Sequence, residues 1–277
     1  MLEDEFGDII AKARVGLGYT VDQVAHLTSL SSRFIERLEN YQEQASAEQV
    51  RVLAEVLSLD PDKLIDIVIN GWEPSPAALP QENALIQTIF VPYGSFGENC
   101  YILTCQQTSK SAVIDPGGAA NEIVHAINES NLSLDLILLT HAHGDHTAGI
   151  PELASNFCEF RVVSHPADKS KIPLIDRLQW QGASDDDQLK LGNLDILVQY
   201  TPGHTPGALC YQVDQVCFVG DTLFAGSIGR PASSDIYEKM LSGIRNKILS
   251  LPRDTIILPG HGPITTVGEE ISHNPFF

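Results

Sequence analysis

The segment THAHGDHTAG, residues 140–149, constrains this chain more than any other. Within six positions it holds His141, His143, Asp145 and His146, although the whole chain has only nine histidines. It overlaps the end of LDLILLT, an apolar run that is typical of a buried strand. Because α/β proteins build their sites on loops at the carboxyl ends of strands, the segment predicts an α/β fold with a site at one edge of its sheet.

Three other polar side chains occupy similar places, each beside glycine and after an apolar strand. They are His204 in TPGHTPG, Asp221 in CFVGDTLF and His261 in TIILPGHGP. Chance would scatter the histidines, whereas five of the nine fall at predicted strand ends. Imidazole and carboxylate groups are suitable ligands for zinc, iron or manganese. These positions therefore favour a metal site over a solvated histidine-rich loop.

The order of residues inside the cluster indicates how it divides. Alternate residues of a roughly extended loop point the same way, so His141 and His143 can reach one metal ion together. Asp145 and His146 break the alternation and can face a second ion beside the first.

Residues 84–277 alternate between strand-like and helical stretches. Amphipathic stretches such as 120–130 and 147–157 predict helices. The pattern indicates an α/β sandwich with sheet inside and helices outside. The predicted strands are LIQTIFVPY, CYILTC, SAVIDPGG, LDLILLT, FRVVSH, LDILVQYT, ALCYQV, QVCFVGD and TIILP.

Residues 1–70 show helical periodicity and no strand-like runs. Thr20, Ser46 and Asp60 each precede an amphipathic stretch and are candidate helix caps. Residues 71–83 hold three prolines and predict an extended linker. We therefore expect an N-terminal all-α domain (1–70), a Pro-rich linker (71–83) and an α/β domain (84–277).

The net charge of −19 disfavours nucleic acid as a partner. No apolar run is long enough to span a bilayer, which argues against a membrane partner. The acidic start, MLEDEFGDII, is unlike a secretory signal, so we expect a cytoplasmic protein. The five cysteines form no Cys-x-x-Cys pair, which favours buried reduced thiols over disulfides or a thiolate zinc site.

Taken together, THAHGDH, TPGHTPG, CFVGDTLF and PGHGP resemble the motif set of the metallo-β-lactamase superfamily, over about residues 86–277. The resemblance implies an αββα sandwich and a binuclear site for two divalent metal ions, with zinc preferred to iron or manganese. The implied ligands are His141, His143 and His204 for the first ion, Asp145, His146 and His261 for the second, and Asp221 as the bridge.

Smaller motifs narrow the branch. ENCYIL, VIDPGG, GDTLFAGSIGR and EISHNPFF look like the glyoxalase II group of thioester hydrolases. This resemblance implies a metal-bound hydroxide that cleaves S-acylglutathione or a related acyl thioester, with Asp145 and Asp221 as catalytic carboxylates. The chain stops soon after His261, so it looks like the short bacterial type. The group's glutathione-binding residues therefore do not carry over.

Other side chains near these motifs have two interpretations. Arg230, in SIGR, could meet an anionic substrate or form a structural salt bridge. Tyr101 and His165 could line the pocket, but we expect them to fill the core.

Two further functions stay open. A persulfide dioxygenase of the same fold would hold one iron ion on His141, His204 and Asp221, a two-histidine, one-carboxylate set. Alternatively, the chain could be a DNA-binding regulator in which the metallohydrolase half senses a metabolite.

The helices at about residues 6–68 resemble the Cro/C1 type of helix-turn-helix domain, through YTVDQVAHLTSLSSRFIERLEN and LAEVLSLDPDKLIDI. The resemblance makes SSRFIERLEN the recognition helix, with Ser31, Ser32 and Arg33 as DNA-contacting candidates. However, residues 1–70 hold six Lys and Arg against thirteen Asp and Glu, which opposes phosphate contact. An interaction module, including one for a homodimer, is therefore favoured over DNA binding.

Overall fold

The structure is a computed structural model that describes residues 1–93 and 96–277. Five short helices come first, and three of them begin at the predicted caps Thr20, Ser46 and Asp60, whose side chains accept backbone N–H groups. No helix of the described residues is long and apolar enough to cross a membrane. The helices are α1 (Phe6–Gly16), α2 (Val21–Thr28), α3 (Ser32–Glu39), α4 (Ala47–Val56) and α5 (Pro61–Val68).

Residues 71–82 form neither helix nor strand, and two six-stranded sheets follow. In the first sheet, β1 to β3 are antiparallel and β3 to β6 are parallel. Its strands lie in chain order: β1 (Ala84–Tyr93), β2 (Phe96–Cys105), β3 (Lys110–Ile114), β4 (Ser133–Leu138), β5 (Arg161–Ser164) and β6 (Gln179–Gly182).

The second sheet is mostly antiparallel, and only β10 and β13 run parallel. A two-stranded ribbon of β11 (Leu223–Phe224) and β12 (Ser227–Ile228) follows β10 in the chain. The order across this sheet is β14 (Thr265–Thr266), β13 (Ile256–Pro259), β10 (Val216–Gly220), β9 (Leu209–Val213), β8 (Leu194–Tyr200) and β7 (Gln188–Leu191).

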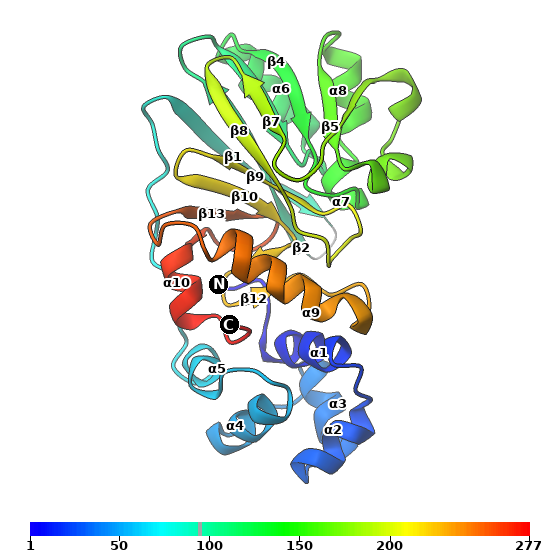
Figure 1. Cartoon of the computed structure of the whole chain (residues 1–277), viewed down its shortest axis with the longest axis vertical. Helices are drawn as coiled ribbons and strands as arrows, with labels where there is room; N and C mark the ends of the chain where they lie inside the picture. Colours follow the sequence, from blue (N-terminus) through cyan, green and yellow to red (C-terminus); the bar gives the residue numbers. More distant parts are fainter. Residues whose placement is uncertain (94–95) are drawn as a thin grey trace.

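The two sheets pack face to face around an apolar core that includes Tyr101 and Phe218, and helices cover both outer faces (Figure 1). This arrangement confirms the predicted α/β sandwich. On the first sheet lie α6 (Ala120–Glu129) and α8 (Ile150–Asn156). Against the second pack α9 (Ser234–Gly243) and the π-helical turn η3 (Ile244–Ile248). The remaining short elements are α7 (Gly144–Thr147), η1 (Pro166–Lys171), η2 (Ile175–Arg177) and α10 (Val267–His273).

The N-terminal helices pack onto this second outer layer (Figure 1). Helix α1 lies beside α9, where Gly16 sits against the ring of Tyr237 so closely that a side chain would not fit. Helix α5 contacts α10. One continuous apolar cluster joins α1–α5 to α9, η3 and the outer face of β9, β10 and β13. The core therefore does not stop at the extended segment 71–83.

The predicted helix 147–157 is wrong at its start. His146 already lies inside the one-turn helix α7, and α8 begins only at Ile150. Pro151 is favourable in the first turn of α8 but cannot continue a preceding helix. The break is held by Gly149, whose N–H donates to the Pro116 carbonyl at 2.8 Å.

Glu270 of α10 gives the fold a testable pH dependence. Its buried carboxylate accepts hydrogen bonds from the Gly226 N–H, the Thr265 hydroxyl and the Asn274 amide. Burial raises the pKa of Glu270 from 4.5 to about 7. The unfolded chain therefore loses this proton at lower pH than the folded chain, so stability falls as pH rises between these values.

We predict that the free energy of unfolding of the wild type, relative to Glu270→Gln, falls by up to about 3 kcal/mol between pH 5 and pH 7.5. Urea unfolding at both pH values measures this difference. The control is Glu55→Gln at an exposed site on α4. An equal pH dependence of wild type and Glu270→Gln would contradict the prediction.

Candidate metal centre

The predicted site residues converge from both sheets onto one edge of the sandwich. His141 and His143 lie on the loop after β4, and Asp145 and His146 lie in α7. The second sheet supplies the rest: His204 from the loop between β8 and β9, Asp221 directly after β10, and His261 after β13.

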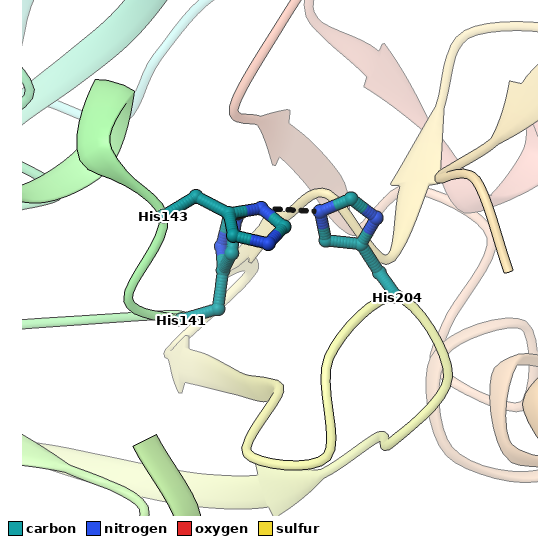
Figure 2. A group of neighbouring side chains, drawn as sticks. All are labelled: His141, His143 and His204. Carbon is teal, nitrogen blue, oxygen red and sulfur yellow. Dashed lines mark hydrogen bonds between the residues drawn. The ribbon is translucent and has the colours of Figure 1, made fainter. Parts of the chain in front are cut away.

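Three imidazoles form the first group of donor atoms (Figure 2). His143 Nδ1 lies 3.1 Å from His141 Nε2 and 3.0 Å from His204 Nε2. An ion that binds imidazole nitrogen at about 2.0–2.1 Å brings its ligands about 3 Å apart. The spacing of this group therefore fits one metal ion.

The second group consists of Asp145, His146 and His261. Asp145 Oδ2 lies 3.9 Å from His146 Nε2 and 3.5 Å from His261 Nε2. These separations are slightly wider than in the first group, and they join one carboxylate to two imidazoles, a donor set that zinc, iron and manganese accept.

Asp221 stands between the groups and presents one oxygen to each. Its Oδ2 lies 3.4 Å from His204 Nε2 and 3.9 Å from His141 Nε2. Its Oδ1 lies 3.4 Å from His146 Nε2 and 3.7 Å from His261 Nε2. Burial would raise the pKa of Asp221, but the histidines, His146 foremost, hold it well below its usual range. The carboxylate is therefore ionised and placed as a bridge would be.

Unsatisfied buried atoms test whether this edge fits metal ions. Within the described residues, His146 Nε2 and Asp221 Oδ1 are fully enclosed and have no hydrogen-bond partner. Such atoms are costly to bury unless another group meets them. Both atoms lie at the second group of donors, so they support an ion there beside the one that the first group fits, and the residues present fit a pair of divalent ions.

Four of the histidines direct Nε2 to the centre, while Nδ1 on the other side of the ring forms a hydrogen bond with an oxygen atom outside the centre. Partners of this kind fix the tautomer and the orientation of a ligating ring. The outward pairs, with nitrogen–oxygen distances, are His141 with Thr140 Oγ1 (3.2 Å), His146 with Asp115 Oδ2 (3.0 Å), His204 with the Arg230 carbonyl (3.0 Å) and His261 with the Gly97 carbonyl (2.8 Å).

Sequence reasoning missed two carboxyl groups at this edge. Asp115 directly follows β3 in VIDPGG, so the strand-end argument applied to His141 could have found it. Its carboxylate also accepts the Thr140 N–H at 2.7 Å. Glu98 lies fully buried in β2 with an oxygen 4.0 Å from His146, and burial raises its pKa to about 10. Glu98 is the first residue of the motif ENCYIL, but nothing in that motif indicated that its carboxyl group would be buried beside His146.

Arg230 lies at the rim of the centre. Its side chain is exposed, and among the described residues its guanidinium makes no ion pair or hydrogen bond, so no structural salt bridge is seen. Tyr101 is core, as predicted, and donates its hydroxyl to the Pro259 carbonyl. The core prediction for His165 is wrong: the ring is half-buried and stacks on Tyr200 at 4.5 Å, because it follows β5 at the same open edge.

The three DNA-contacting candidates lie at the start of α3, on the N-terminal helices. The Ser31 hydroxyl caps α3 by accepting the Phe34 N–H, and the Ser32 hydroxyl donates to Asp22 at 2.5 Å. Arg33 is exposed. Two of the three side chains are therefore engaged in local structure.

We predict that Asp115→Asn weakens binding of the ion at Asp145, His146 and His261 about 10- to 100-fold. The Thr140 N–H and the His146 Nδ1–H bond to separate oxygens of Asp115, whereas an uncharged amide offers only one acceptor oxygen. Metal content after dialysis against graded chelator measures the affinity. Asp135→Asn, at a residue of β4 paired with Lys110 on the surface, is the control and should bind as the wild type. Unchanged affinity in Asp115→Asn would contradict the assignment.

Known proteins resemble this chain in sequence and in fold. Residues 93–261 match the model of the metallo-beta-lactamase superfamily. Hydroxyacylglutathione hydrolase GloC of Haemophilus influenzae is 34% identical over 206 residues, which cover 67% of this chain and 95% of GloC. The crystal structure of the BLEG-1 B3 metallo-beta-lactamase is 32% identical, with a TM-score of 0.61 over 69% of this chain and 99% of BLEG-1. That of TTHA1623 in a di-iron-bound form is 30% identical, with a TM-score of 0.57 over 68% of this chain and all of TTHA1623. This chain therefore belongs to the metallo-beta-lactamase superfamily.

Proposed function

We propose that the protein is a binuclear metallohydrolase that cleaves an acyl thioester, S-acylglutathione or a related compound, in the manner of glyoxalase II. The position of Asp221 carries this proposal, since one carboxylate offers an oxygen to each of two donor groups. The 34% identity to GloC, across almost all of that hydrolase, supports the thioester.

Two divalent ions held here would lower the pKa of a bound water and polarise the substrate carbonyl. The chain's own residues would set the geometry. Outward hydrogen bonds leave Nε2 of His141, His146, His204 and His261 directed at the centre. The Asp145 side chain is 26% exposed, more than Asp221 at 10%. Asp145 can therefore also accept a hydrogen bond from the attacking water and orient it.

The donors fit more than one metal. We propose zinc first, because imidazole and carboxylate at these spacings suit it, with iron or manganese as alternatives. The di-iron form of TTHA1623 supports iron as the first of these alternatives.

The alternatives are less well supported. A persulfide dioxygenase would need only His141, His204 and Asp221 around one iron ion, and the complete second group favours two ions. A DNA-binding regulator would need free polar side chains at the start of α3, where Ser31 and Ser32 are engaged and Arg33 is the one exposed basic candidate.

We predict that the metal-loaded protein hydrolyses S-lactoylglutathione or a short acyl-coenzyme A without oxygen, and that His261→Ala lowers kcat more than about 100-fold because the second donor group is lost. Loss of thioester absorbance and metal content per chain are measured together. Oxygen uptake with glutathione persulfide, without thioester loss, would instead establish the dioxygenase.

A second prediction concerns Arg230. Because its exposed guanidinium is unpaired within the described residues, we expect Arg230→Ala to raise KM for an anionic thioester about tenfold while kcat changes little. Arg230→Lys should restore part of the affinity. Arg33→Ala, at an exposed arginine of α3, is the matched control. An unchanged KM in Arg230→Ala would exclude a substrate contact.

A further inference from the structure

Lys12 connects the N-terminal helices to the body of the protein. It is only 5% exposed, although it lies on α1, in the helices that precede the linker. Its ammonium donates to the Ile228 carbonyl at 2.7 Å and to the Asp4 carboxylate. It also lies 4.8 Å from the centre of the Phe224 ring. All three interactions are buried, so the ion pair is held in one place rather than exposed to solvent.

The residues that follow Ile228 in the chain contact two of the proposed metal ligands, Asp221 and His204. Gly229 follows Ile228, and a side chain there would come within 1.7 Å of the Asp221 carbonyl oxygen and 3.4 Å of His204 Cβ. The next residue, Arg230, accepts the His204 Nδ1–H with its carbonyl. The backbone that Lys12 holds is therefore the backbone that supports Asp221 and orients His204.

The Phe224 end leads to a third ligand. The Phe224 ring meets the His261 ring edge to face, with centres 6.0 Å apart. The start of the chain also reaches this loop: Glu3 packs on Gly262, where an added Cβ would lie 2.8 Å from Glu3 Cβ. Gly262 has a φ of +74°, so glycine is favoured there for conformation as well as for space.

We propose that Lys12 is a positioning residue of the metal centre, and that the N-terminal helices act on the metallohydrolase through it. This inference rests on the two metal sites proposed above. A buried ion pair often adds little net stability compared with apolar groups, so its value here lies in holding the Ile228 carbonyl and the Phe224 ring in place. Loss of the ammonium lets residues 224–230 relax and loosens His204, Asp221 and His261.

The chain offers a matched control for docking alone. Lys63 of α5 also joins the N-terminal helices to the body, through the Ile271 and Phe277 carbonyls. Those acceptors belong to α10 and the chain end rather than to the metal centre. Lys63→Met therefore removes a lysine bridge of the same kind whose own acceptors lie outside residues 224–230.

The experiment measures metal affinity by chelator competition and the visible absorption of the cobalt(II)-loaded full chain. We expect Lys12→Met to bind metal about tenfold more weakly and to alter the cobalt spectrum. A tenfold loss is the smaller end of the effect that follows when a group supporting a metal ligand is removed. Lys12→Arg keeps a donor and should recover most of the affinity. Lys63→Met should keep wild-type affinity and spectrum, whatever its melting temperature.

Because Lys12→Met leaves the Asp4 charge buried alone and could unfold the chain, Asp4→Asn with Lys12→Met is the second variant. It removes both charges and still lacks the ammonium that reaches Ile228, so it should show the same tenfold loss. Wild-type affinity and spectrum in this double variant would overturn the inference while leaving the proposed function intact. A wild-type chain that binds fewer than two ions would overturn both.

Discussion

The arrangement of Asp221 is the constraint on which the rest of the site depends. A carboxylate can face two donor groups only if the ends of β4, β10 and β13 meet at one edge, although β4 belongs to one sheet and β10 and β13 to the other. The core between the sheets sets this meeting, because it fixes how the two sheets lie against each other. Burying so many polar atoms lowers the stability of the protein until metal ions satisfy them. The metal-free protein must therefore be stabilised by its apolar cores.

Most of the metal ligands were predictable from the sequence, because a recognisable sequence pattern marks the end of each strand. An apolar run followed by glycine and a polar side chain marked His204, Asp221 and His261, and all three lie at the shared edge. Helix caps were equally predictable, because the side chains of Thr20 and Ser46 accept backbone N–H groups only three residues further along the chain. The strands β6 and β7 were missed because QWQG and QLKL are only four residues long and hold few apolar side chains.

What the sequence did not indicate were contacts between distant segments. Lys12 resembles any helix-surface lysine in the sequence, and only the packed structure shows its ammonium buried against Ile228. The burial of Glu98 was unpredictable for the same reason, because it depends on the neighbouring β3 and α7, although the residue belongs to the motif ENCYIL. The Pro-rich composition of 71–83 indicated an extended segment but carried no information on whether the helices before it would dock.

The shared apolar cluster has a consequence for handling the protein as separate parts. The family match covers residues 93–261, so α1–α5 lie outside it. Helix α9 carries Tyr237, Met240 and Leu241, which are buried in the apolar cluster shared with α1–α5. Removing α1–α5 by a cut within residues 71–83 would expose these side chains to water and leave an apolar surface that favours aggregation. We therefore expect residues 84–277 to be less soluble when they are expressed without α1–α5 than in the full chain.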